Sequence, residues 1–223
     1  MDKCCGVGCG SHPELSPDVG ADSESQRIAF FDATALTWDH RLDLPAERQR
    51  LDAGLAHLGV QPDERVVDVG CGTGNLTLCL LAKLSEKGRV AAVDISPRMI
   101  GVAREKTQDS RVTWHVEDAR RLTLDDGDYD RVICYSVWPH FEDRKAVATE
   151  LARVLKVGGL LHVWHTVSRC KINKIHAACG AAIANDVLPP VEETADVLLS
   201  AGFRIIAAVE SDESYLVTAA KLA

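Results

Sequence analysis

Short apolar runs alternate with longer segments in which apolar residues recur at helical spacing. The apolar runs are rich in Val, Ile and Ala and predict buried strands over residues 65–69, 88–93, 111–116, 129–135 and 160–164. The helical spacing predicts helices over residues 75–84, 96–107 and 142–155. Regular alternation of strand and helix implies right-handed crossovers and a mainly parallel sheet covered by helices on both faces.

The two ends of the chain depart from this alternation. Apolar positions from Glu24 to Trp38 predict an amphipathic helix, and a second helix is predicted over residues 46–58. Near the C-terminus the pattern predicts helices over residues 171–184 and 191–199, then strands over residues 203–209 and 215–220. The link between these two strands is so short that they must form an antiparallel hairpin. The predicted fold class is therefore α/β, a doubly wound seven-stranded sheet ending in an antiparallel hairpin strand.

Residues 1–23 show no periodicity and are rich in Gly, Ser, Pro and Asp. They are predicted to form a flexible cysteine-containing tail before a single domain, residues 24–223, which begins with a helical cap. The thiols of Cys4, Cys5 and Cys9 are candidate ligands for a soft metal or metalloid. Their spacing matches no closed zinc pattern, so an incidental thiol-rich tail is the alternative.

The composition narrows the possible partners. The chain has 223 residues, of which 46% are hydrophobic and 26% charged, as in a soluble globular protein. Its net charge of −8 argues against nucleic acid as a partner, because such binding depends on clustered Lys and Arg. No apolar run is long enough to cross a membrane, and no secretory signal pattern is present, so a cytoplasmic protein with reduced thiols is expected. A small-molecule partner is favoured, whereas the sequence predicts no oligomeric state.

A glycine-rich turn joins the first predicted strand of the sheet to the next helix. Glycines alternate at Gly70, Gly72 and Gly74, where they permit positive φ and close approach of a ligand to the backbone. The helix that follows offers free N–H groups to an anion. Asp94 and Asp118 end the next two strands, and ligands bind beyond the carboxyl ends of parallel strands. The pattern predicts a nucleoside site in which Asp94 accepts hydrogen bonds from ribose hydroxyls and Asp118 contacts the base.

The sequence resembles the class I S-adenosylmethionine-dependent methyltransferases, particularly the small-molecule branch that includes ubiquinone and menaquinone methyltransferases. The resemblance covers residues 27–222 and is carried by D-V-G-C-G-T-G at 68–74, by Asp94, by E-D-A at 117–119 and by R-V-L-K-V-G-G at 153–159. It implies a Rossmann-like fold, S-adenosyl-L-methionine as cofactor, and in-line transfer of a methyl group to a small-molecule acceptor. The cofactor-binding residues that it implies are Asp68, Gly70, Cys71, Gly72, Gly74, Asn75, Asp94, Ile95, Asp118, Ala119 and Cys134.

Nicotinamide dehydrogenases use a similar glycine turn, G-x-G-x-x-G. Here the third glycine at that spacing is missing, and Asp68 would place a negative charge near a pyrophosphate. The same carboxylate is favourable beside the ammonium group of a methionine moiety. The turn therefore favours a methyltransferase over a dehydrogenase.

The acceptor side of the site is less clearly marked. A sulfonium already activates the methyl group, so alignment supplies most of the acceleration, and an oxygen or nitrogen acceptor also needs a base to remove a proton. His165, His176 and Tyr135 are the predicted acceptor-side residues, and His140 is a further candidate base. Each histidine could instead pack structurally. The aromatic residues expected to close the pocket are Phe30, Phe31 and Trp38.

Other functions remain open on the sequence. His140, His165 and His176, with Asp186, could form a site for zinc, iron or nickel, although their spacing neither supports nor excludes it. Cys134 and the other cysteines leave a metalloid or thiol methyltransferase as an alternative. A non-catalytic thiol- or metal-binding protein on the same fold is another. Nucleic-acid amino methylation is disfavoured, because the Asp/Asn-Pro-Pro-Tyr motif is absent after the fourth strand.

Overall fold

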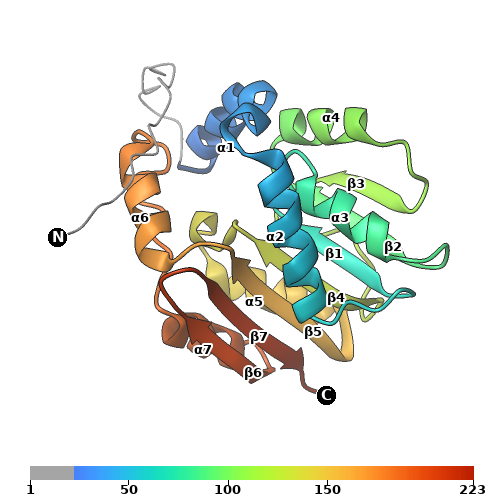
Figure 1. Cartoon of the computed structure of the whole chain (residues 1–223). Helices are drawn as coiled ribbons and strands as arrows, with labels where there is room; N and C mark the ends of the chain where they lie inside the picture. The colour runs from blue at the N-terminus through green and yellow to red at the C-terminus, as the bar shows by residue number, and fades with distance from the viewer. Residues whose placement is uncertain (1–22) are drawn as a thin grey trace.

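The computed structural model describes residues 23–223 and contains one seven-stranded sheet (Figure 1). The strand order is β3-β2-β1-β4-β5-β7-β6. Strand β7 runs antiparallel to both β5 and β6, whereas the other neighbouring strands are parallel. This arrangement confirms the predicted fold class. The strands are β1 (Arg65–Val69), β2 (Arg89–Asp94), β3 (Val112–Val116), β4 (Tyr129–Tyr135), β5 (Leu155–His165), β6 (Phe203–Glu210) and β7 (Tyr215–Lys221).

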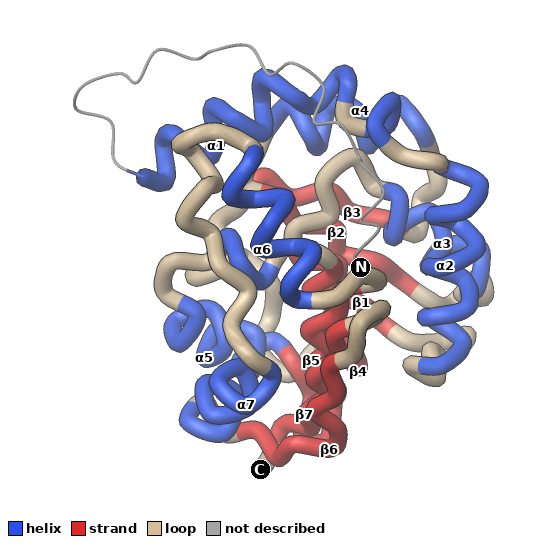
Figure 2. The backbone as a smooth tube through the Cα atoms, turned by 60° about the vertical axis from the view of Figure 1, so that its left-hand side comes forward, coloured by secondary structure: helices blue, strands red, loops and turns tan. Residues whose placement is uncertain are grey.

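Helices cover both faces of the sheet (Figure 2). Val66 of β1 belongs to a core cluster with Leu55 and Leu80, whereas the next residue, Val67, belongs to a cluster with Leu151. Burial on both faces explains why the parallel strands are apolar almost throughout. One layer contains α2 (Leu44–His57), α3 (Asn75–Lys83) and α4 (Pro97–Lys106), and the other contains α5 (Arg144–Val154) and α7 (Val191–Ser200).

The N-terminal cap, residues 23–43, is broken where one helix was expected. It consists of α1 (Ser23–Thr34) and two short 3₁₀ helices, η1 (Ala35–Thr37) and η2 (Asp39–Arg41). The hydroxyl of Thr34 donates to the carbonyl oxygens of Phe30 and Phe31 at 3.0 and 3.2 Å. Such local bonding competes with continued helix, so the prediction of one helix reaching Trp38 is wrong.

Three other predicted boundaries are corrected. Helix α6 (Arg169–Ala178) ends before residue 184, because the chain turns at Gly180 with a φ of +87°. Helix α5 begins at Arg144 because Asp143 caps it by accepting from the Ala146 N–H at 2.9 Å. Strand β5 begins at Leu155, upstream of the predicted start at residue 160. Within residues 23–223, no helix has the length and apolar character needed to span a membrane.

Candidate functional site

The glycine turn, residues 70–74, leads from β1 into α3 and is bonded to the neighbouring strand. The N–H groups of Gly70 and Cys71 donate to the Val93 carbonyl of β2 at 2.8 and 3.0 Å. Gly70 has a φ of +70°, and a Cβ there would lie 2.3 Å from Cγ2 of Val137. The loop after β4 therefore packs directly on the turn, and only glycine fits. Gly72 has a φ of +52°, but a Cβ there would meet open space.

Two carboxylates flank the glycine turn, and neither pairs with a cationic side chain of residues 23–223. Asp68 is 1% exposed and accepts from the Thr77 hydroxyl at 2.6 Å. Burial raises the pKa of Asp68 to about 7 and that of Asp94 to about 6. Asp94 accepts from the backbone N–H groups of Gly72 and Ser96 at 2.8 and 2.9 Å. A ligand that brings a positive charge would stabilise the ionised form of both carboxylates.

A cavity of about 1330 Å³ opens at the carboxyl edge of the sheet, walled by the N-terminal cap, the strand ends and α6. This volume exceeds the roughly 300–1,000 Å³ of a pocket for one drug-sized ligand. The cavity therefore has room for a nucleoside cofactor and a second molecule. The predicted site residues on its wall are Asp68, Gly70, Cys71, Gly72, Asn75, Asp94, Ile95, Asp118, Ala119, Tyr135, His140 and His176.

Three predicted site residues are not brought to this wall. Cys134 is 0% exposed in the middle of the core, and burial raises the pKa of its thiol. His165 is also 0% exposed, and its ring packs edge-on to Tyr215 at a centroid distance of 5.6 Å. Burial lowers the pKa of His165 to about 3. Gly74 caps α3 with a φ of +83°, and a Cβ there would lie 3.1 Å from Cβ of Ala103. The expected ligand contacts of Cys134 and His165 are therefore corrected to core packing.

The remaining acceptor-side candidates differ in their hydrogen bonds. The Tyr135 hydroxyl lies 2.5 Å from Oε1 of Glu47 and 2.9 Å from Oγ1 of Thr166, so it is already engaged. Nδ1 of His176 lies 2.5 Å from the backbone oxygen of Asp186. Nδ1 of His140 lies 2.7 Å from Oδ2 of Asp186. Both imidazole rings are thus oriented by the same residue.

The histidines do not form the metal site considered from the sequence. Within residues 23–223, no group of three or more His, Cys, Asp or Glu side chains is placed to hold a metal ion. His140 and His176 direct Nδ1 to Asp186, and His165 is enclosed by the core. The other predicted ligands, Cys4, Cys5 and Cys9, lie outside the described residues.

Carboxylates of the N-terminal cap bind the glycine turn and α4, which sequence reasoning missed. Asp39 accepts from the Thr73 hydroxyl at 2.7 Å and from the Asn75 amide at 3.0 Å, and it pairs with Lys106 at 2.6 Å. Asp32 accepts from the Ser96 hydroxyl at 2.5 Å. The sequence around Asp32 and Asp39 does not distinguish them from solvent-exposed carboxylates of a helix, because their hydrogen-bond partners are distant in sequence.

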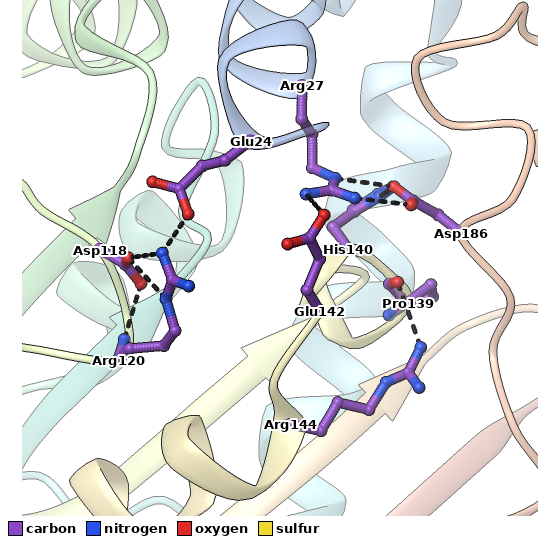
Figure 3. Close-up of polar contacts among 9 residues, drawn as sticks. All are labelled: Glu24, Arg27, Asp118, Arg120, Pro139, His140, Glu142, Arg144 and Asp186. Atoms are coloured by element: carbon purple, nitrogen blue, oxygen red, sulfur yellow. Dashed lines mark hydrogen bonds and ion pairs between the residues drawn. The ribbon is translucent and has the colours of Figure 1, made fainter. Parts of the chain in front are cut away.

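Further contacts join α1 to residues on and behind the cavity wall (Figure 3). Arg120 bonds to both Asp118 and Glu24, so the carboxylate expected to contact the base is also held by an arginine. Arg27 contacts Asp186 at 3.0 Å through Nη2. Phe31 and Trp38 lie on the wall with centroids 5.9 Å apart, as expected for residues that close a pocket.

Replacing Asp39 by asparagine is expected to lower the free energy of unfolding by about 1–3 kcal/mol and to speed proteolysis of the cap. The neutral amide forms no ion pair with the Lys106 ammonium. Its NH₂ group also cannot accept the hydrogen bonds that Thr73 and Asn75 donate to Asp39. Urea unfolding and limited proteolysis measure the two effects. Glu105→Gln is the matched control, since Glu105 is exposed beside Lys106 in sequence, and it should change stability by at most about 0.5 kcal/mol. Equal effects of the two variants would contradict a docking role for Asp39.

A doubly wound sheet with its glycine turn and acidic strand ends at one cavity defines a Rossmann-like α/β domain for a nucleoside-containing ligand. Residues 66–159 match the family model described as a methyltransferase domain. The chain is 32% identical to malonyl-[acyl-carrier protein] O-methyltransferase of Bacillus cereus, over 51% of this chain and 41% of that protein. It is 34% identical to the ubiquinone/menaquinone biosynthesis C-methyltransferase UbiE of Vibrio cholerae, over 47% of this chain and 42% of that protein.

The matched stretch spans less than half the length of these curated relatives. Among solved structures, magnesium protoporphyrin IX methyltransferase of Synechocystis, with S-adenosylhomocysteine bound, superposes with a TM-score of 0.69. That likeness has 22% identity and covers 90% of this chain and all of the other, and it supports the fold. The methyltransferase-domain match over residues 66–159 and the curated relatives together support a class I S-adenosylmethionine-dependent methyltransferase, the family that this chain resembles.

Proposed function

We propose that this protein transfers the methyl group of S-adenosylmethionine to a small-molecule acceptor. The observation that carries the proposal is the glycine turn, where the buried carboxylates Asp68 and Asp94 lie on the wall of a cavity large enough for two molecules. Relatives named as O- and C-methyltransferases support the same reaction class.

The residues at the turn suit the charged and polar parts of the cofactor. Asp68 offers a carboxylate to the ammonium group of the methionine moiety. Gly70 and Gly72 let the backbone approach closely. A carboxylate has about four lone-pair sites, and backbone N–H groups occupy two on Asp94, so its oxygens retain capacity for two ribose hydroxyls. Asp118 and Ala119 line the cavity and would border the adenine.

The cofactor supplies an electrophilic methyl group, and the protein supplies alignment. The N-terminal cap and α6 line the cavity opposite the strand ends, where they would shield part of a bound acceptor from water. Selectivity for the acceptor therefore resides in the half of the cavity away from the glycine turn.

The metalloid or thiol alternative has less support. Burial raises the pKa of both Cys71 and Cys134, so neither offers a ready thiolate at neutral pH.

Binding of S-adenosylhomocysteine is expected to weaken as the pH falls from 8 to 5.5, by about tenfold or more. In the free protein Asp68 and Asp94 have pKa values of about 7 and 6, so they gain protons over this range. The ammonium group of the ligand favours the ionised carboxylates, so binding releases protons and is strongest above pH 7. Calorimetry across this pH range measures the effect and tests the proposal.

Asp68→Asn is the control for this pH dependence. It removes the group with the higher pKa and should flatten the pH profile above pH 6. A wild-type affinity that is constant or rises toward pH 5.5 contradicts the assignment of Asp68, and no binding at any pH contradicts the proposed function.

A further inference from the structure

His140 lies on the cavity wall, and its Nδ1 contacts the buried carboxylate of Asp186, which does not line the cavity. His140 belongs to η3 (Trp138–His140), and its backbone N–H donates to the Val137 carbonyl at 2.9 Å. The side chain of Val137 fills the space that a Cβ on Gly70 would need. In the same loop Ser136 has a φ of +55°, a strained conformation for a non-glycine residue that is typical of functional sites. His140 is therefore fixed to the residue that packs on the glycine turn.

From this placement we propose that His140 is the base that takes the proton from a hydroxyl group of the acceptor, with Asp186 as its positioning residue. The inference rests on the proposed function and narrows the acceptor to a molecule with a weakly acidic hydroxyl, such as a phenol. A thiol acceptor, by contrast, ionises near neutral pH without a base.

The hydrogen bond to Asp186 sets the tautomer of His140. An ionised carboxylate only accepts, so Nδ1 of His140, at 2.7 Å from Oδ2, carries the proton. The lone pair of the neutral ring is then on Nε2. Arg27 donates to both oxygens of Asp186 at 3.0 and 3.1 Å and holds the carboxylate in place (Figure 3). A fixed tautomer with an oriented carboxylate is the arrangement of a histidine base.

The surroundings of His140 keep the ring neutral. Burial lowers its pKa, and the contact with Asp186 acts in the opposite direction. The ring lies between His176, with centroids 4.8 Å apart, and Phe31, with centroids 5.1 Å apart. The titratable and charged groups around the pair come from α1, the segment after η3, α5, β5 and α6: Arg27, Glu142, Arg144, His165 and His176.

The other candidates at the wall are less suited to this step. Nδ1 of His176 faces a neutral backbone carbonyl, which stabilises an imidazolium less than a carboxylate does. The Tyr135 hydroxyl is bonded to Glu47, and burial raises its pKa, so the phenol keeps its proton.

The step conserves atoms and charge. The acceptor hydroxyl gives its proton to Nε2 of His140, and an electron pair of that oxygen forms the new C–O bond to the methyl carbon. The C–S bond breaks, and its electron pair stays on sulfur as a neutral thioether. The positive charge of the sulfonium thus ends on the imidazolium, next to the carboxylate of Asp186.

The test compares two probe acceptors, catechol and thiophenol, by measuring S-adenosylhomocysteine formed from S-adenosylmethionine at pH 7. His140→Gln should lower the rate with catechol by about 100-fold or more and leave the rate with thiophenol within about threefold. The catechol deficit should shrink as the pH approaches 10, because the phenol then ionises by itself. A merely structural role would not produce this pH dependence.

Asp186→Asn tests the positioning role by a readout other than turnover. In ¹⁵N NMR spectra, wild-type His140 should show a protonated Nδ1 and an unprotonated Nε2, and the variant should lose this preference. Each of four results overturns the proposal: an unchanged catechol rate in His140→Gln, an equal loss with both probes, the opposite tautomer in the wild type, or no wild-type turnover of catechol. Calorimetry with S-adenosylhomocysteine tests the proposed function separately. The affinity of His140→Gln for this ligand should stay within about threefold of the wild-type affinity, whatever the turnover results.

Discussion

Replacing Asp94 by alanine is expected to weaken S-adenosylhomocysteine binding by about 100-fold or more. Hydrogen bonds to a charged group contribute about 1.5–3 kcal/mol each, and the variant loses those from both ribose hydroxyls. It also frees the Gly72 and Ser96 N–H groups that the carboxylate holds at 2.8 and 2.9 Å. Isothermal calorimetry measures the affinity. Because burial disfavours the charge of Asp94, its removal offsets part of the cost to stability.

Asp130→Ala is the matched control for this experiment. Asp130 also accepts a backbone N–H, that of Arg65 at 2.8 Å, and it pairs with Lys156 at 2.6 Å. Asp130 is the second residue of β4, so it lies at the amino end of this strand, whereas the cavity lies at the carboxyl ends of the parallel strands. This variant should lose stability and keep its affinity for S-adenosylhomocysteine. Equal affinities of Asp94→Ala and wild type, or equal losses in both variants, would show that the ribose lies elsewhere.

Gly72→Ala is expected to lower the affinity for S-adenosylhomocysteine by about tenfold or more, whereas Gly59→Ala leaves it unchanged. The two glycines have φ values of +52° and +69°, and a Cβ at either one meets no atom within 4 Å. Both variants should therefore lose similar stability, about 1–2 kcal/mol, from the left-handed backbone. Only Gly72 lies on the cavity wall, where its new methyl group takes space from the ligand.

Thermal unfolding and calorimetry on the two glycine variants separate backbone strain from contact with the ligand. Gly70→Ala extends the series, because its Cβ would also overlap Val137 and should cost about 1–3 kcal/mol more. Equal affinities in Gly72→Ala and Gly59→Ala would mean that the backbone at Gly72 does not approach the cofactor.

The order of strands and helices in this chain is largely predicted by the local spacing of its apolar residues. Strands buried on two faces are continuous apolar runs, and the four-residue link between β6 and β7 permits only a hairpin. The path of the N-terminal cap could not be predicted in this way. Its path depends on contacts such as Asp32 with Ser96 and Asp39 with Thr73, which join residues far apart in sequence. The end of α6 was missed because the apolar spacing continues past Gly180.

Residues of the candidate site could be predicted where a sequence motif fixes the backbone. They could not be predicted as well where the direction of a side chain decides whether it reaches the cavity. Asp68 and Asp94 follow from their places at the strand ends beside the turn. The sequence predicts that both Cys134 and Tyr135 contact the ligand, yet successive side chains of a strand point to opposite faces, and of these two only Tyr135 reaches the wall. His165, at the end of β5, likewise packs against Tyr215 of β7 in the core.

A crystal structure of the complex with S-adenosylhomocysteine tests the central claim most directly. We expect the ribose hydroxyls within hydrogen-bond distance of the Asp94 carboxylate and the ammonium group on the side of Asp68. The sulfur should face the part of the cavity that His140 lines. A ligand seated elsewhere in the cavity, or a ribose that makes no contact with Asp94, would contradict the account.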